Sequence, residues 1–148
     1  MKHLLFIIHC SLFIVFLTGC GNQHKLGGKV SFPDGSPLTC GTIILSNDTF
    51  LARANINPDG TYDVGSFSEK DGLPPGKYKV YITGAVTVAG KKKSKQTVVT
   101  EDGKTKTIEV EEDILESLIA GKFTGRETTP LEIEVPGEKA FNITVEKP

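Results

Sequence analysis

The stretch Lys77–Thr83, KYKVYIT, alternates polar and apolar side chains more regularly than any other part of the chain. Successive side chains of a β-strand point to opposite faces, so the alternation puts Tyr78, Val80 and Ile82 together on one face. A Pro-Gly pair directly before the stretch favours a turn, which sets the register of the strand. The pattern therefore predicts a half-buried strand, and it constrains the fold more than any other feature of the sequence.

Similar short stretches recur, separated by turn signals. Asp-Gly and Pro-Gly pairs are turn candidates because Gly accepts a positive φ and Asp bonds the neighbouring backbone. They occur at 34–35, 59–60, 71–72, 75–76, 102–103 and 136–137. The strands expected between them, besides 77–83, are 29–32, 42–45, 51–56, 61–64, 131–135 and 141–145. Seven short strands, each with one apolar face, predict an all-β fold of the β-sandwich type.

Three motifs carry a resemblance to a known family. They are GGKVSFPDGSPLTCGTIIL from Gly27, INPDGTYDVG from Ile56 and LPPGKYKVYITG from Leu73. Their order and spacing resemble the carboxypeptidase-regulatory and transthyretin-like domains, and more narrowly the small lipoproteins abundant in planctomycetes. Lys122-Phe123 and the segment 129–135 match a later motif of that group. The resemblance covers roughly residues 27–83 and 118–147, and it implies a seven-stranded Greek-key, prealbumin-like sandwich.

Residues 84–117 depart from the family pattern and are expected to be an insertion. Asp102-Gly103 lies between two Thr- and Val-rich stretches, which predicts an inserted hairpin. After it, Ile114, Leu115, Leu118 and Ile119 share one helical face. Acidic residues precede them and Gly121 follows, so a short helix is predicted at about 111–120.

The first residues resemble a bacterial lipoprotein signal. The apolar run from Leu4 to Phe16 is about a dozen residues long, against roughly 20 for a membrane-spanning helix, and this length suits a secretory signal. Leu17-Thr18-Gly19-Cys20 has the form of a lipobox. The resemblance implies a signal peptide over 1–19, diacylglycerol on the Cys20 thiol, and cleavage before Cys20. Residues 20–27 would be a tether, and 28–148 the β-sandwich domain. An ordinary signal peptide or short anchor with an incidental Cys20 is the alternative.

The composition of the chain argues against several kinds of catalytic and binding site. The net charge of −1 gives no argument for nucleic acid. His3 and His9 lie in the signal and His24 in the tether, so no histidine is left for a catalytic triad. Cys40 would be the lone cysteine of the domain, expected to be a buried apolar side chain rather than a reactive thiol. A calcium loop starting at Asn55 fails because its twelfth position is Ser rather than Glu. No catalytic residue, metal ligand or cofactor is expected.

The expected function is therefore that of an exported lipoprotein of the cell membrane or outer membrane, with its domain in the periplasm or at the cell surface. Its sandwich would act as a non-enzymatic binding or scaffold module for an envelope protein or a polysaccharide. An envelope hydrolase or transferase that uses loop carboxylates is the alternative. The basic run Lys91, Lys92, Lys93 and Lys95 is a candidate contact for anionic headgroups or an acidic polymer, or else a solvated loop tip.

Overall fold

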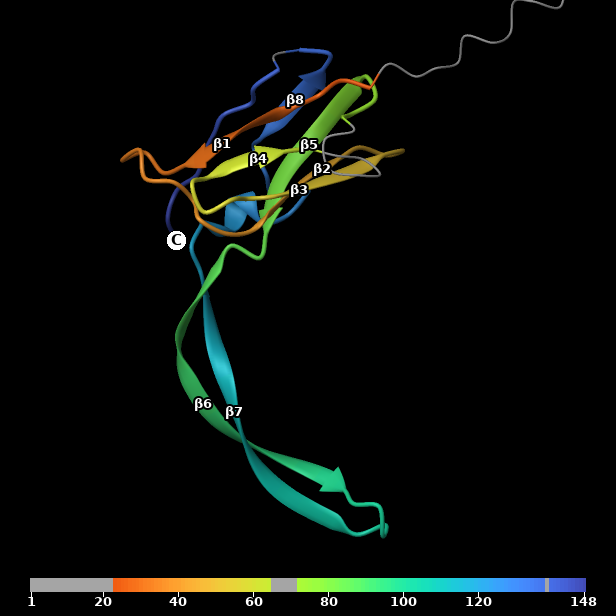
Figure 1. The fold of residues 1–148 in the computed structure, drawn as a ribbon, viewed down its shortest axis with the longest axis vertical. Coiled ribbons are helices and arrows are strands. Elements are labelled where there is room, and N and C mark those ends of the chain that lie inside the picture. The colour runs from red at the N-terminus through yellow and green to blue at the C-terminus, as the bar shows by residue number, and fades with distance from the viewer. Residues whose placement is uncertain (1–22, 65–71, 138) are drawn as a thin grey trace, which may run out of the picture.

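The computed structural model describes residues 23–64, 72–137 and 139–148. The described part of the chain is all-β, and its one helical element is the short 3-10 turn η2 (Gly121–Phe123). Figure 1 shows a compact body from which a long hairpin projects. The strands are β1 (Gly27–Ser31), β2 (Thr42–Ser46), β3 (Leu51–Asn55), β4 (Thr61–Asp63), β5 (Gly76–Thr83), β6 (Val86–Val99), β7 (Thr105–Ser117), β8 (Glu132–Val135) and β9 (Ile143–Thr144).

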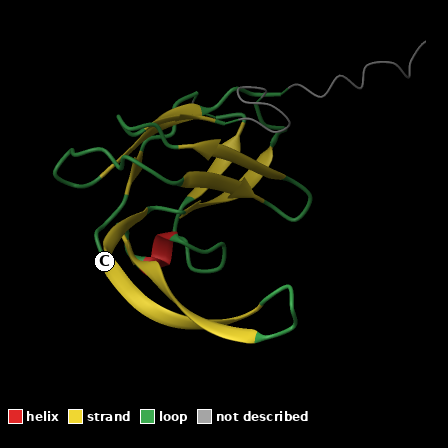
Figure 2. Cartoon of the chain, turned by 60° about the horizontal axis from the view of Figure 1, so that its bottom comes forward, coloured by secondary structure: helices red, strands yellow, loops and turns green. Residues whose placement is uncertain are grey.

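Two sheets form the body. One has four strands in the order β3-β2-β5-β8, and the other has three in the order β4-β1-β9. Neighbouring strands are antiparallel, except that β1 and β9 run parallel. Val30 and Tyr62 from the smaller sheet are buried in the same apolar cluster as Leu45, Val80 and Ile82 from the larger one. The body is therefore sandwich-like, with one core shared by two sheets (Figure 2).

Strand β5 is built as its alternation predicts. Tyr78, Val80 and Ile82 are buried, while the side chains of Lys77 and Thr83 are exposed. β5 pairs with β2 on one side and with β8 on the other, so it is an interior strand. The six other predicted strands are also confirmed, as β1, β2, β3, β4, β8 and β9. The last of them is shorter than expected, because only Ile143–Thr144 pairs with β1 as a strand.

The predicted inserted hairpin is confirmed, and the predicted helix at 111–120 is wrong. Residues up to Ser117 belong to β7, and each acidic residue at 111–113 lies opposite a lysine of β6. Cross-strand pairs of opposite charge stabilise an antiparallel ladder. A helix there would leave the β6 backbone without its partner strand. The ladder therefore overrides the helical spacing of the four apolar side chains.

The boundary of the expected tether also needs correction. Leu26, within the expected tether at 20–27, is buried in the core, and β1 begins at Gly27. His24 forms a bridge with Leu73, with two backbone hydrogen bonds of 2.8 Å. His24, Leu26 and Gly27 therefore pair or pack with the body. The expected signal peptide, the lipobox and Cys20 lie outside the described residues.

Candidate functional site: the β6–β7 arm

The hairpin of β6 and β7, hereafter the arm, lies outside the two sheets that enclose the core. Its strands pair with each other along their length and with no other strand of the described residues. Figure 1 shows the arm curving away from the body. At its tip the Thr100 N–H donates to the Lys104 carbonyl at 2.8 Å, and Gly103 takes a φ of 78° that favours glycine. The arm is therefore an extension that the two sheets of the body do not cover.

The root of the arm is fixed to the body. Ala85 and Ile119 flank the arm on its two sides, and both are buried in the core. The Leu118 N–H donates to the Ala85 carbonyl at 2.9 Å, which closes the ladder at this end. The Cys40 thiol lies 3.6 Å from the Val86 carbonyl oxygen and donates to it. Cys40 is half-buried rather than buried as expected, because it sits where the arm leaves the body.

The two faces of the arm differ in chemistry. Cross-strand pairs alternate between faces, so the register assigns each pair to one of them. We call one the apolar face; its apolar side chains are Val98, Ile108, Val110 and Ile114. We call the other the charged face; it carries Lys91, Lys93 and Lys95 opposite Asp113, Glu111 and Glu109. An irregularity between Val88 and Gly90 shifts the alternation of β6 near the root, which brings Val86 and Val88 onto the charged face beside Leu115. Val99, at the tip, lies on the charged face as well.

The structure places all four lysines of the basic run on β6, with Lys92 alone on the apolar face. Lys91 lies 3.6 Å from Glu111, and Lys92 lies 3.2 Å from Glu112. Lys93 and Lys95 are directly opposite Glu111 and Glu109. The acidic strand beside them offsets the positive field, and exposed pairs of this kind contribute little to stability. The run is therefore one half of a charge-paired ladder rather than an isolated positive patch.

Glu112 is the polar centre of the apolar face. Its Oε1 accepts hydrogen bonds from the Ser94 hydroxyl at 2.8 Å and from the Gln96 amide at 3.4 Å. The Ser94 hydrogen bond, and after it Lys92, hold the pKa of Glu112 below its usual value. The carboxylate is therefore ionised at neutral pH, and it divides the apolar side chains near the tip from Ile114 nearer the root.

Exposed apolar side chains gather on the arm. Val99 is 72% exposed, Leu115 59% and Val88 55%. Of the large apolar side chains that are exposed in the described part of the chain, all but Leu51 belong to the arm. Sequence reasoning missed this surface because it assigned Ile114 and Leu115 to a helix. The signal was present in the alternation of Ile108 and Val110 with threonine and glutamate.

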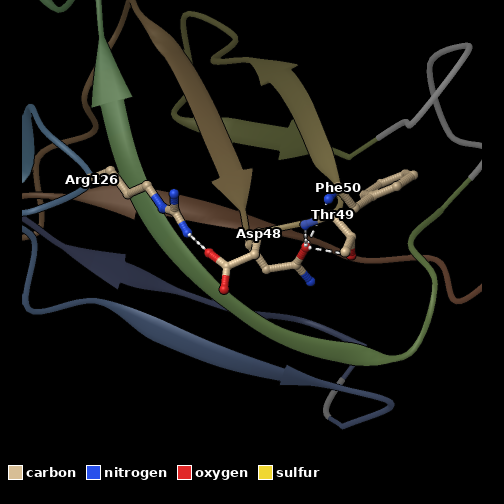
Figure 3. Close-up of polar contacts among 5 residues, drawn as sticks. Asp48, Thr49, Phe50 and Arg126 are labelled. Carbon is tan, nitrogen blue, oxygen red and sulfur yellow. Dashed lines mark hydrogen bonds and ion pairs between the residues drawn. The ribbon is translucent and has the colours of Figure 1, made fainter.

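A second polar cluster lies on the body, where β2 turns into β3 (Figure 3). The Asn47 side-chain oxygen accepts from the Phe50 N–H at 2.8 Å and from the Thr49 N–H at 3.0 Å. The Arg126 guanidinium donates to Asp48 at 2.6 Å. Nearby, the Ser46 hydroxyl is buried and has no hydrogen-bond partner among the described residues. A serine nucleophile needs a base within hydrogen-bond reach, and the described residues place none beside Ser46. The polar contacts of this cluster are those of a turn with an ion pair.

The described residues give little support for a metal site, a catalytic carboxyl or a membrane-spanning helix. Within 23–64, 72–137 and 139–148, no three His, Cys, Asp or Glu side chains come together as a metal site would need. Asp34 and Asp59 each accept hydrogen bonds from a residue of their own turn, Ser36 and Thr61, and these bonds lower the pKa of both carboxyls. No helix in the described part of the chain has the length and apolar character needed to cross a membrane.

Comparison with protein-family models, with characterised proteins and with solved structures finds no match to this chain.

Proposed function

We propose that this protein is a lipid-anchored envelope protein that acts as a non-enzymatic binding module, with the β6–β7 arm as its contact element. The observation that carries the proposal is the concentration of exposed apolar side chains on the arm. Large apolar side chains are unfavourable in water, so their concentration on one projecting element supports a role of that element in interaction.

The architecture of the arm supports this role. A two-stranded hairpin is at best marginally stable in water by itself, and a third strand or a packed face is what stabilises it. Strands of 14 and 13 residues are also longer than most strands in globular proteins. The buried core lies in the body, so the length of the arm is not needed to build it. A partner that covers the arm would supply the missing contacts.

The proposed fold of the body is a transthyretin-like sandwich. Sheets of four and three strands with a common core are in keeping with a seven-stranded Greek-key sandwich of the transthyretin-like type. The lipobox at Leu17–Cys20 supports export and a lipid anchor on Cys20, which would hold the domain in the periplasm or at the cell surface. The partner would be an envelope protein or a polysaccharide.

The alternative, a hydrolase or transferase built on loop carboxylates, has no specific support. A general acid at neutral pH needs a raised pKa, usually obtained by burial. The turn carboxyls Asp34, Asp59 and Asp102 have lowered pKa values because a neighbouring Ser or Thr hydroxyl donates to each. The carboxylates of β7 lie opposite lysines or on an exposed strand.

The test compares the full chain with a variant in which residues 87–116 are replaced by a short Gly-Ser linker. Both chains are expressed with the same tag, and bound envelope components are cross-linked and identified. We expect at least one component to be captured by the full chain and lost with the arm. A third variant, Arg126→Ala, alters the polar cluster at the β2–β3 turn and should capture the same components as the full chain. Identical capture with and without the arm would contradict the proposal.

A further inference from the structure

The outer edges of the arm carry opposite charge. β6 has four lysines and no acidic side chain, while β7 has five acidic side chains and one lysine, Lys106. In the described part of the chain, neither strand pairs with any strand but the other. A long unpaired edge is a template for another strand, unless its side chains repel that strand. The charges on each edge therefore determine which strand can pair with it.

The hydrogen bonds at both ends of the arm show which backbone groups point outward. Thr100 bonds Lys104 at the tip, and Leu118 bonds Ala85 at the root. In an antiparallel ladder, pairs that exchange hydrogen bonds alternate with pairs whose N–H and C=O groups point away. Counting from Thr100, the pairs that point away include Thr97 with Thr107 and the lysine–acid pairs of the charged face. Both edges therefore offer free N–H and C=O groups in the same rows.

The charges decide between the ways in which two copies could pair. A symmetric dimer through β6 and β6 would place lysines beside lysines, and one through β7 and β7 would place acids beside acids. Like charges on adjacent strands are destabilising. Pairing β6 of one copy with β7 of the next brings lysines beside acids, which is the arrangement already present within the arm in the rows of Lys91, Lys92 and Lys93.

We infer that the arm binds a second copy of this chain edge to edge, with β6 of one copy pairing antiparallel to β7 of the next in the register of the arm itself. The apolar faces of adjacent arms then lie on the same side of one continuous sheet, and Ile108, Val110 and Val98 gain apolar neighbours. Because each copy has one edge of each kind, the contact is heterologous and can repeat in a ring or a filament. This inference rests on the proposed role of the arm as the contact element, and it names the partner.

The test uses two full-length chains with different tags, both carrying Cys40→Ser. One also has Thr97→Cys on β6 and the other Thr107→Cys on β7, and membranes from cells expressing both are oxidised. In the inferred register the two cysteines are on adjacent strands, at a Cα separation of about 5.5 Å that a disulfide spans. Two Thr97→Cys residues would be two strands apart, about 10 Å, which a disulfide does not span.

We expect a mixed-tag disulfide dimer when the two chains are expressed together, and only the background of the Cys40→Ser parent when either is expressed alone. Dimers within the Thr97→Cys chain alone would show symmetric pairing and overturn the inference. Absence of the mixed dimer would overturn it as well. In that case the proposed function still stands if an envelope component other than this chain is captured through the arm.

A second pair of variants tests the backbone edge without cysteine chemistry. Thr97→Pro removes an N–H that points outward and leaves the bonds inside the arm, whereas Thr97→Ala keeps that N–H. Self-association of the full chain in detergent, measured by light scattering, should weaken about tenfold in Thr97→Pro, the effect of losing one backbone hydrogen bond. It should be unchanged in Thr97→Ala and should weaken with added salt. Equal association in Thr97→Pro and Thr97→Ala would overturn the edge-to-edge contact.

Discussion

At the scale of single residues, the core face of β5 gives the sharpest test of the fold. The Val80 side chain is completely buried, so Val80→Asp would put an unpaired carboxylate into the apolar core. The cost of several kcal/mol is comparable to the whole stability of a domain, about 5–15 kcal/mol, and we expect loss of cooperative unfolding in a circular dichroism melt.

The control for that variant lies one residue away, on the outer face of β5. Lys79 is paired across the strands with Glu132, with a nitrogen–oxygen distance of 2.5 Å, so an acidic replacement would create a like-charge pair. Lys79→Gln avoids this and should change the free energy of unfolding by less than about 1 kcal/mol, because exposed ion pairs contribute little. Equal losses in the two variants would mean that β5 is not half-buried.

Gly→Ala substitutions at two Asp-Gly turns of the body distinguish the cost of backbone strain from the cost of a steric contact. Gly35 and Gly60 have φ values of 83° and 85°. A Cβ on Gly35 would meet nothing within 4 Å, but one on Gly60 would lie 2.6 Å from the Val30 carbonyl oxygen. Gly35→Ala should therefore cost about 1 kcal/mol of strain, and Gly60→Ala clearly more. Urea unfolding of both variants measures the difference, and equal costs would show that the contact with Val30 relaxes freely.

At the scale of elements, sequence periodicity predicted correctly those strands whose burial in the sheet matches their local pattern. β5 alternates and is interior, so local pattern and burial point the same way. The segment 111–117 shows the opposite case, because its apolar spacing and acidic start fit a helix. Its partner is a lysine-rich strand about twenty residues earlier in the chain. A pattern read over a short stretch of sequence cannot show this pairing, because the two strands are not neighbours in the sequence.

The arm as an element should be dispensable for the stability of the body. Replacing residues 87–116 by a short Gly-Ser linker keeps Ala85 and Ile119, which are the buried residues at its root. Loop closure changes by only about 0.6 kcal/mol per doubling of loop length, so the midpoint of thermal unfolding should move by no more than about 5 °C. Loss of cooperative unfolding in this variant would show that the arm takes part in the folding of the core.

At the scale of the whole molecule, the sequence indicated the region of the candidate site but not its chemistry. The insertion stood out by its departure from the surrounding pattern, and the lysine run was visible in it. Two features define the arm as a candidate site: the pairing of that run with the acids of β7, and the exposure of the valine, isoleucine and leucine side chains. The exposure depends on how far the arm projects from the body, and no residue pattern encodes that distance.

In the proposed function, Cys20 fixes the position of the molecule in the cell. If the lipobox is used, the Cys20 thiol carries a diacylglycerol, and two acyl chains hold a protein firmly at a membrane where one holds it only marginally. Cys20→Ala should abolish the lipid and release the chain from the membrane fraction, or leave it with an uncleaved signal that mass spectrometry detects. Cys10→Ala is the matched control, because Cys10 lies within the expected signal peptide and would be removed with it. That variant should be processed and fractionate like the parent. A Cys20→Ala chain with the mass and membrane association of the parent would contradict lipidation.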